Sequence, residues 1–373
     1  MVITATASTS ETGDTGLRSN PKHLGSVDAL RGLAAIYVAC LHTTIMPSPY
    51  LAMPDWARPL IMSGSTAVAL FFVVSAFTLS NSWFSRNDGS HPVRNFYLRR
   101  IFRIVPLFYF LLALTLLRDW FVWHKLHSAT SILLNASMLF NLVPGGSTGI
   151  VWASWTIGVE ILFYLMFPLV VKVASTPVRL GVCFISAIGL AVLFYQGVQH
   201  SPLSNLKKAA FLPTGLALHV PVFLLGIIAY KIFVSEPFRQ IRGRWLGGIL
   251  VAAALVFHLV LAYRGMYPGR VRPDLSALPW TLLVLGLAIS PVKLIVNAVT
   301  RFYGRISYSV YLNHPIVILL LKPIYVWIYQ YVPGYLLALL TCFAVTFAVL
   351  TPWAYITYRL IEKPGIRFGS RLI

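Results

Sequence analysis

The stretch VDALRGLAAIYVACLHTTIM, residues 27–46, is apolar enough to cross a lipid bilayer as a helix. Two ionisable residues interrupt it, Arg31 and His42, eleven positions apart. Eleven helical residues return to within roughly 20° of the same face after about 16 Å, so both side chains line one stripe. An ionisable group at membrane depth is costly unless it faces a bundle interior or water. The pair therefore indicates a site inside the membrane.

Structural explanations of the same pair stay open at this stage. Arg31 lies near the start of its helix, so its side chain could extend to the lipid headgroups, and Asp28 could neutralise it from one turn away. His42 could be a packing residue that is hydrogen-bonded to a backbone carbonyl. The shared stripe favours the functional interpretation.

The whole chain has the composition of a polytopic membrane protein. Of its 373 residues, 58% are hydrophobic and 11% are charged. We expect an all-α integral membrane protein, a bundle of about ten transmembrane helices. The predicted spans are 27–46, 60–82, 104–123, 150–172, 178–197, 211–231, 245–263, 279–296, 306–329 and 335–358. The apolar segment 131–143 is too short to span comfortably, so we expect a re-entrant or interfacial helix there.

The net charge of +20 follows the predicted topology, so we expect no nucleic-acid partner. Basic residues gather in alternate connecting segments, which the positive-inside rule places in the cytoplasm. These residues are Arg18, Lys22, Arg86, Arg94, Arg99, Arg100, Arg103, Lys172, Arg179, Lys231, Arg239, Arg242, Arg244, Lys293, Arg301, Arg305, Arg359, Lys363, Arg367 and Arg371. We therefore expect a multi-pass protein of the cell inner membrane with both termini in the cytoplasm.

The chain divides into a tail and one membrane domain. Residues 1–26 are rich in Ser, Thr and Gly and have no apolar run, so we expect a disordered cytoplasmic tail, followed by a polytopic domain over 27–373. Cys40, Cys183 and Cys342 lie in separate apolar segments without ligand-like spacing, so we predict neither a disulfide nor a metal site.

A basic cluster, RNFYLRRIFRIVP at 94–106, stands at the cytoplasmic mouth of the third predicted span. Within it, Arg99, Arg100 and Arg103 follow the spacing of one helical face. Guanidinium groups bind phosphates bidentately and stay charged when partly desolvated, so this face suits an anionic ligand. Ordinary positive-inside topology with lipid headgroup contacts is the alternative.

A carboxylate, Glu160, lies about midway along the fourth predicted span, in WASWTIGVEILFYLMFP at 152–168. It is the only acid that we place deep within a span. An interior cation is its expected partner, with Arg31 as the structural candidate. If it neighbours a histidine, it could also orient that ring and raise its basicity.

The segment GRISYSVYLNHP, residues 304–315, places polar groups on one face of an apolar helix. Ser307, Tyr311 and His314 follow i, i+4 and i+7 spacing, and Pro315 frees a backbone carbonyl beside the histidine. By contrast, we expect His219 and His258 to be structural, because no polar residues accompany them.

In their order and spacing, these segments resemble the membrane acyltransferases of the acyltransferase 3 group, which O-acylate glycans and other hydroxylated acceptors. The resemblance runs nearly end to end. The matching segments are DALRG followed by His42, FFVVSAFTLS at 71–80, RRIFRIVPLFY at 99–109, WTIGVEILFYLMFP at 155–168, ISYSVYLNHP at 306–315 and YRLIEKP at 358–364.

The resemblance implies a bundle of transmembrane helices, a cytoplasmic acyl-CoA donor, and an essential arginine and histidine on the first helix, which map to Arg31 and His42. The chain departs from the family pattern at Ile161, where a second acid is frequent, and at Ala76, where a glycine is usual. Many relatives carry an additional soluble domain that acts on the glycan. Here we expect the bundle alone to receive the acceptor.

The sequence thus predicts a membrane O-acyltransferase, with acetyl-CoA as the expected donor and a hydroxyl of a cell-surface or exported glycan as acceptor. His42 is the predicted general base, Glu160 its orienting acid, and Arg31 the group that stabilises an oxyanion or holds donor phosphate. The arginine face of 99, 100 and 103 would bind the phosphates of coenzyme A. Tyr311 and His314 would line the donor or acceptor side, and no metal is required.

A secondary transporter or permease for a glycan or lipid-linked intermediate is the alternative. Buried Arg, His and Glu side chains also suit substrate or proton coupling in such proteins. Transporters often contain inverted repeats with paired broken helices, and we find no such repeat in this sequence.

Overall fold

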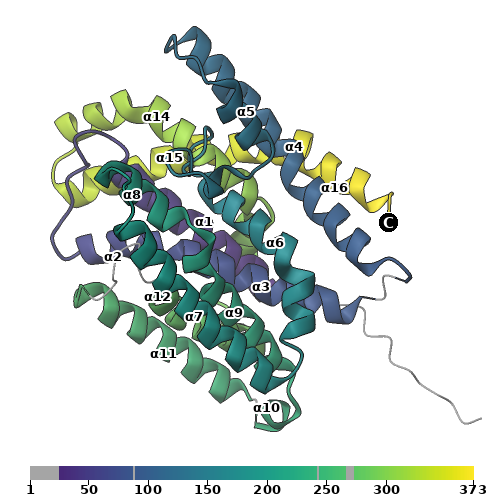
Figure 1. Ribbon diagram of the computed structural model, residues 1–373. Helices are drawn as coiled ribbons and strands as arrows, with labels where there is room; N and C mark the ends of the chain where they lie inside the picture. The colour runs from purple at the N-terminus through teal and green to yellow at the C-terminus, as the bar shows by residue number, and fades with distance from the viewer. Residues whose placement is uncertain (1–24, 87–88, 242, 266–272) are drawn as a thin grey trace, which may run out of the picture.

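The computed structural model describes residues 25–86, 89–241, 243–265 and 273–373, and within them every regular element is helical (Figure 1). The helices are α1 Gly25–Ile45, α2 Arg58–Met62, α3 Ala67–Ser85, α4 Pro92–Phe121, α5 Ala129–Ala136, α6 Trp155–Val173, α7 Pro177–Gln199, α8 Asn205–Phe211, α9 Leu216–Val234, α10 Glu236–Ile241, α11 Arg244–Tyr263, α12 Pro273–Ile289, α13 Ala298–Arg305, α14 Ser307–Tyr331, α15 Tyr335–Thr357 and α16 Lys363–Ser370. Most of the predicted tail lies outside the described residues, and its last two positions, Gly25 and Ser26, already belong to α1.

Within the described residues, eight helical segments are long and apolar enough to cross a membrane. They are Arg58–Ser85, Pro92–Phe121, Trp155–Val173, Pro177–Gln199, Asn205–Val234, Trp245–Tyr263, Ser307–Tyr331 and Tyr335–Ser370. The two other predicted spans correspond to α1, which carries Asp28 and Arg31, and to α12, whose apolar part, Leu275–Ile289, is shorter. The prediction of an all-α membrane bundle is confirmed, and the number of about ten helices is approximate.

Several helix boundaries differ from the predicted spans. The third span was expected from residue 104, but α4 already begins at Pro92, so the basic cluster forms the first three turns of the same helix. The last span was expected to end at residue 358, but a π-helical turn, Tyr358–Glu362, joins α15 to α16 and continues the helix to Ser370. In both places a polar segment extends an apolar helix, and the hydropathy pattern marks only its apolar part.

The short apolar segment 131–143 forms two pieces instead of one helix. Residues up to Ala136 belong to α5, and Phe140–Leu142 form a single 3₁₀ turn. Phe140 is fully buried, whereas Leu133 and Leu142 are exposed. The segment therefore folds back against the bundle without crossing it.

Helix α1 lies inside the bundle, packed against α3, α13 and α14. Two glycines let α1 and α13 approach until their backbones touch. A Cβ atom at Gly32 would collide with the backbone of Thr300 and Gly304, and a Cβ atom at Gly304 would collide with the backbone of Asp28. Small residues at such contacts are typical of membrane helix pairs. The contact fixes the start of α1, and hence Arg31, against α13.

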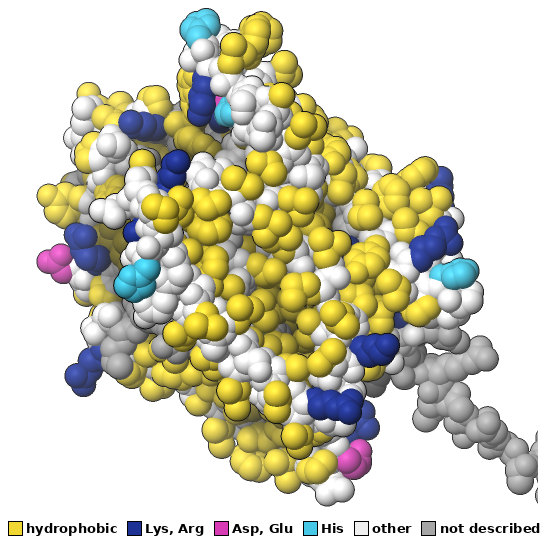
Figure 2. Space-filling model, viewed as in Figure 1, with side chains coloured by type: hydrophobic (Ala, Val, Ile, Leu, Met, Phe, Trp, Pro, Cys, Tyr) yellow, Lys and Arg dark blue, Asp and Glu magenta, His cyan; other side chains and the backbone are white. Residues whose placement is uncertain are grey.

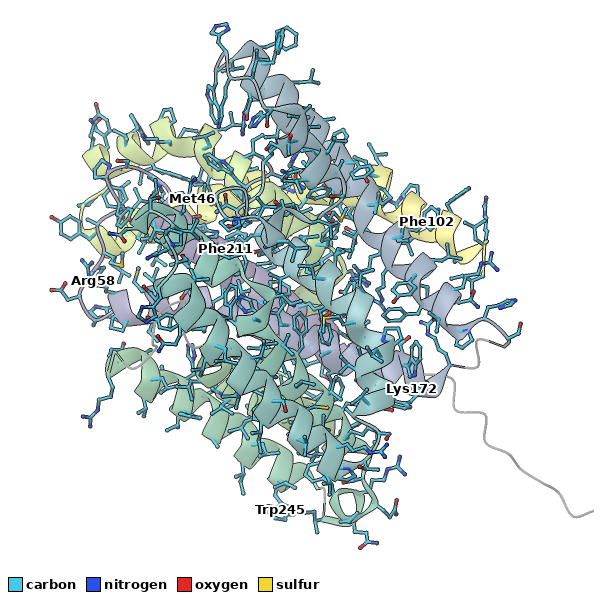
Figure 3. All side chains as sticks on the ribbon, in the orientation of Figure 1. Met46, Arg58, Phe102, Lys172, Phe211 and Trp245 are labelled. Carbon is cyan, nitrogen blue, oxygen red and sulfur yellow. The ribbon has the colours of Figure 1, made fainter. Side chains whose placement is uncertain are left out.

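The outer surface matches a lipid-facing bundle. Large apolar side chains on α7 and α11, such as Val178, Leu193 and Trp245, point outward with about 70% of their surface exposed. Figure 2 shows hydrophobic side chains across the middle of the visible face and basic side chains toward its edges. Arg58 and Lys172 lie at opposite ends of the bundle in Figure 3. A lipid bilayer is the solvent that such a surface requires.

Candidate active site

The two histidines singled out in the sequence meet in the structure. The Nδ1 atom of His42, near the end of α1, lies 2.6 Å from the Nε2 atom of His314 on α14. The ring planes lie within 7° of parallel and the centroids are 4.9 Å apart, so the rings lie edge to edge, as an in-plane hydrogen bond between the two nitrogens requires. His314 is completely buried and His42 is partly buried. The pair joins residues that are 272 positions apart in the chain.

The protons of this pair follow from the backbone of α14. The Nδ1 atom of His314 lies 2.5 Å from the carbonyl oxygen of Tyr311. Pro315, four residues after Tyr311, has no N–H to offer this carbonyl, so the histidine replaces the missing helical donor. A carbonyl only accepts, and therefore Nδ1 of His314 carries the proton.

The tautomer of His42 is then determined. With Nδ1 protonated, the neutral ring of His314 has its lone pair on Nε2, and that atom accepts from Nδ1–H of His42. The Nε2 atom of His42 consequently carries the lone pair that a general base needs.

Most of the other predicted residues line a cavity of about 70 Å³, which lies nearer the start of α1 than His42 does. Arg31 from α1, Arg100 and Arg103 from α4, and Glu160 from α6 all line it. The Nη2 atom of Arg31 donates a hydrogen bond of 2.9 Å to the Thr78 hydroxyl on α3, which holds the guanidinium in place. Four charged groups from three helices thus share one small volume inside the bundle.

Glu160 balances part of this positive charge. Its Oε1 atom accepts a hydrogen bond of 2.5 Å from the Ser75 hydroxyl, which in turn lies 3.1 Å from the Tyr164 hydroxyl. Arg31 and Arg100 both lie within electrostatic range of the carboxylate. The guanidinium of Arg100 also lies over the ring of Tyr164, with its central carbon 5.7 Å from the centroid. Glu160 therefore lies close enough to Arg31 and Arg100 to offset part of their charge, while its described hydrogen bond is to Ser75.

The contacts described for Glu160 and for His42 are to other residues, and the link between the two stays a prediction. Nδ1 of His42 donates to His314, whereas the carboxylate accepts from Ser75. Glu160 lines the arginine cavity, and neither histidine is among the residues that line it. The orienting group for His42 is thus a second histidine.

Tyr311 connects the two groups. Its ring lines the arginine cavity and lies 5.6 Å, between centroids, from the ring of His314. Its hydroxyl accepts a hydrogen bond of 3.0 Å from Thr156 on α6. Since its carbonyl also holds His314, one residue positions the histidine pair and forms a wall of the cavity.

The structure brings two of the three arginines predicted on one face of α4 to the cavity. Arg100 and Arg103 line it, and Arg99 is not among the described residues that do so. Around the helix Arg99 lies about 40° from Arg103 and about 100° from Arg100, so it stays beside Arg103 on the predicted face.

Glu362 is a buried acid that the hydropathy pattern does not reveal. Glu362, in the motif YRLIEKP, is 1% exposed and accepts a hydrogen bond of 2.7 Å from the Ser309 hydroxyl on α14. It lies within electrostatic range of Arg103. We had placed this acid beyond the last span because the apolar run ends before it, whereas the π-helical turn returns it to the interior. The only sequence signal for this acid was that its segment, YRLIEKP, is one of those that resemble the acyltransferase family.

His219 and His258 keep to the structural roles expected of them. Nε2 of His219 donates to the carbonyl of Pro213 over 2.9 Å. His258 has more polar company than the sequence suggested, because its Nε2 atom lies 3.2 Å from the Tyr37 hydroxyl and 3.4 Å from that of Ser63.

Comparison with known proteins assigns the chain to a family. A family model described as an acyltransferase domain matches residues 24–354. The acyltransferase MdmB of Streptomyces mycarofaciens is 29% identical over 79% of this chain and 79% of its own length. The peptidoglycan O-acetyltransferase OatA of Listeria monocytogenes is 22% identical over 93% of this chain, which spans 56% of OatA. Nodulation protein 10 of Rhizobium leguminosarum is 23% identical over 94% of this chain and 95% of its own length.

No solved structure matches the chain. The family match nevertheless covers the histidine pair, the arginine cavity and all but the last of the long helices. The chain is a multi-pass membrane protein that belongs to the acyltransferase 3 family.

Proposed function

We propose that the protein is an inner-membrane O-acyltransferase that moves an acyl group, acetyl in the first instance, from cytoplasmic acyl-CoA to a hydroxyl of a cell-surface or exported glycan. Family membership and the relative named an acyltransferase support acyl transfer, and the name of another relative, a peptidoglycan O-acetyltransferase, supports a hydroxyl acceptor. The observation that carries the proposal is the chain from the Tyr311 carbonyl through His314 to His42.

In this proposal His42 is the general base. Its Nε2 atom takes the proton of the acceptor hydroxyl while the oxygen attacks the carbonyl carbon of the thioester. The carbon–sulfur bond then breaks, and the departing thiolate takes the proton from the imidazolium. His314 is the positioning residue, because its hydrogen bond keeps His42 in the basic tautomer and faces the charge that develops on that ring.

Arg31 is the proposed stabiliser of the oxyanion, with the acyl carbonyl at the Tyr311 wall of the cavity, since Tyr311 lines the cavity and also contacts His314. Fixed guanidinium groups in a site with little water stabilise developing negative charge far better than they do in solution. Glu160 holds Arg31 and Arg100 in place and keeps the cavity from accumulating excess positive charge. At about 70 Å³, the cavity has room for a small acyl group with a few atoms of its thioester, but not for a nucleotide.

The cavity also refines the proposed role of the arginine cluster. Arg100 and Arg103 reach the same small volume as Arg31, so they suit the thioester end of the donor. Arg99, which does not line this cavity, suits the interfacial lipid or the approach of the anionic donor. The phosphates of coenzyme A then need a larger space nearby.

The first test is acetyl transfer from radiolabelled acetyl-CoA to extracted surface glycan by membranes that contain the protein. We expect His42→Ala to lower the rate about 10²- to 10⁴-fold, because general-base catalysis contributes that much. His200→Ala is the matched control, since His200 is exposed at the end of α7. A correctly inserted His42→Ala protein with a normal rate would remove His42 from the mechanism.

The same label separates direct transfer from a relay through an acyl-histidine. Direct transfer leaves purified protein unlabelled when acceptor is omitted. Label that stays on the wild type without acceptor, and is lost in His42→Ala, would show that the imidazole carries the acyl group.

A further inference from the structure

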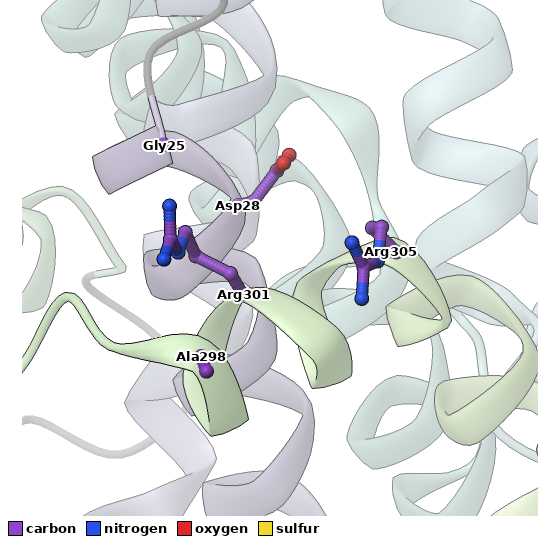
Figure 4. Close-up of a pocket in the computed structure, with 5 residues that line it drawn as sticks. All are labelled: Gly25, Asp28, Ala298, Arg301 and Arg305. Atoms are coloured by element: carbon purple, nitrogen blue, oxygen red, sulfur yellow. The ribbon is translucent and has the colours of Figure 1, made fainter.

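A second, larger pocket opens beside the start of α1. It has a volume of about 540 Å³, within the roughly 300 to 1,000 Å³ of typical small-molecule sites. Gly25 and Asp28 from α1 and Ala298, Arg301 and Arg305 from α13 line it (Figure 4). The sequence places both arginines in a segment predicted to face the cytoplasm.

The two arginines line one pocket because of local structure. They are four residues apart on α13, so they share one helical face. Figure 4 shows them on the same ribbon, with Asp28 on the neighbouring helix. A Cβ atom at Gly25 would lie 3.3 Å from Cδ of Arg301, so the Arg301 side chain packs in space that a larger residue at position 25 would crowd.

The element that carries the arginines is anchored independently of them. Asn297 caps α13 by accepting from the backbone N–H of Thr300 over 3.0 Å, and the Thr300 hydroxyl accepts from the backbone of Asn297. The backbone contact of Gly32 with Gly304 then fixes α13 on α1. The guanidinium groups of Arg301 and Arg305 are thus presented from a rigid support.

The charge of the pocket favours an anion. It holds two guanidinium groups and one carboxylate. Asp28 also lies within electrostatic range of Arg31, which neutralises part of its charge from the cavity side. Two forked cationic groups in an accessible pocket suit phosphate, which arginine binds bidentately.

On both helical walls, residues that line the pocket lie only a few positions before residues that line the inner cavity. On α1, Asp28 of the pocket precedes Arg31 of the cavity by one turn, and beside it Ser307 of the cavity follows Arg305 of the pocket by two residues. The two spaces thus lie on adjacent stretches of the chain, which is the arrangement that a donor reaching from Arg301 and Arg305 to Arg31 requires.

We infer that this pocket binds the phosphorylated nucleotide end of the acyl-CoA donor through Arg301 and Arg305. The inference rests on the proposed function. The inner cavity is too small for a nucleotide, and the neighbouring pocket provides the volume and two guanidinium groups for its phosphates.

The test compares two donors in reconstituted full-length protein. We expect Arg301→Gln with Arg305→Gln to raise the KM for acetyl-CoA at least tenfold with kcat within about twofold, because charged hydrogen bonds contribute roughly 1.5 to 3 kcal/mol each. S-acetylpantetheine has the same thioester and no phosphate. Its KM should be equal in the wild type and the variant.

Arg359→Gln with Arg367→Gln is the matched control, since it removes the same charge from exposed positions toward the end of the chain. We expect that variant to keep the wild-type KM for both donors. An equal rise in KM for acetyl-CoA and S-acetylpantetheine, or no rise for either, would overturn the nucleotide site.

An anionic lipid headgroup offers the same phosphate chemistry from another source. Repeating the assay in vesicles with and without anionic lipid separates the two. A defect of the double variant that follows the lipid composition, with the KM for acetyl-CoA unchanged, would overturn the donor site. A wild type that transfers nothing from acetyl-CoA would overturn the proposed function itself, whereas normal wild-type transfer with an unaffected double variant overturns the pocket alone.

Discussion

Pro315 removes one main-chain donor from α14, and His314 supplies a side-chain donor in its place. In an interior without water, an unpaired carbonyl at Tyr311 would cost free energy comparable to a lost hydrogen bond. The replacement satisfies that carbonyl and fixes the imidazole at the same time. The missing N–H of Pro315 thus determines which ring nitrogen of His314 carries the proton.

His314 variants test whether this pattern matters for catalysis. We expect His314→Ala to lower kcat by about 10²-fold or more while the KM for acetyl-CoA changes little, since the donor pocket is untouched. His314→Gln places an amide oxygen near the former Nε2 position, so it should recover part of the activity. Steady-state kinetics of the purified proteins measure both effects.

Folding is the control for this comparison. Both variants lose the same imidazole, so similar midpoints of thermal unfolding in detergent would leave tautomer control as the difference between them. If Ala and Gln at this position gave the same kcat, the hydrogen bond to His42 would have no catalytic role.

Helix α1 depends on its glycine contact with α13. We expect Gly32→Ala to lower the free energy of unfolding by about 1 to 3 kcal/mol, because the added methyl group meets the backbone of Thr300 and Gly304 and neither can move aside as a side chain would. The midpoint of thermal unfolding in detergent reports the change.

Gly189→Ala on α7 is the matched control. This glycine is exposed, and a Cβ atom there has no neighbour within 4 Å. Alanine is also the better helix former, so the control should be neutral or slightly stabilising. Equal midpoints for the two variants would contradict a tight contact between α1 and α13.

At the level of elements, the apolar runs predicted most spans because an exposed polar residue within a span is costly. The runs could not predict that α4 starts at Pro92, nor that the last helix continues to Ser370. Both extensions are polar, and they are helical because they pack against each other: Phe102 of α4 contacts Gly369 of α16. Such packing joins residues far apart in the chain, so the local hydropathy of the sequence cannot predict it.

The candidate site shows the same division. Residue type and depth alone identified Arg31, His42 and Glu160, since each is costly in an apolar span. Their partners could not be predicted, because His42 meets a residue 272 positions away and the partner depends on how α1 and α14 pack. Glu362 was missed because a local change to π-helical winding directs it inward.

For the whole molecule, the predicted topology assigns the two ends of α7 to opposite sides of the membrane. Its 23 residues span about 34 Å, enough for the hydrocarbon core. In a protein whose native cysteines are replaced, we expect Leu206→Cys to react with a membrane-impermeant maleimide on intact cells. Ser175→Cys should react only after the membrane is opened.

The two positions serve as each other's control, because both are exposed and differ only in the end of α7 beside which they lie. The opposite labelling pattern would place both termini outside. It would also place the arginine pocket on the side of the membrane opposite to cytoplasmic acyl-CoA, and this result would overturn the proposed function.

The glycine contact between α1 and α13 has a consequence for which donors the protein accepts. Gly32 lies next to Arg31, and Gly304 lies next to Arg305, so the contact joins the inner cavity and the outer pocket at their nearest points. Because backbone meets backbone there, neither wall can slide to accommodate a longer or shorter molecule. Under the proposed function, this fixed spacing would select a donor by the distance from its anionic end to its reactive carbon.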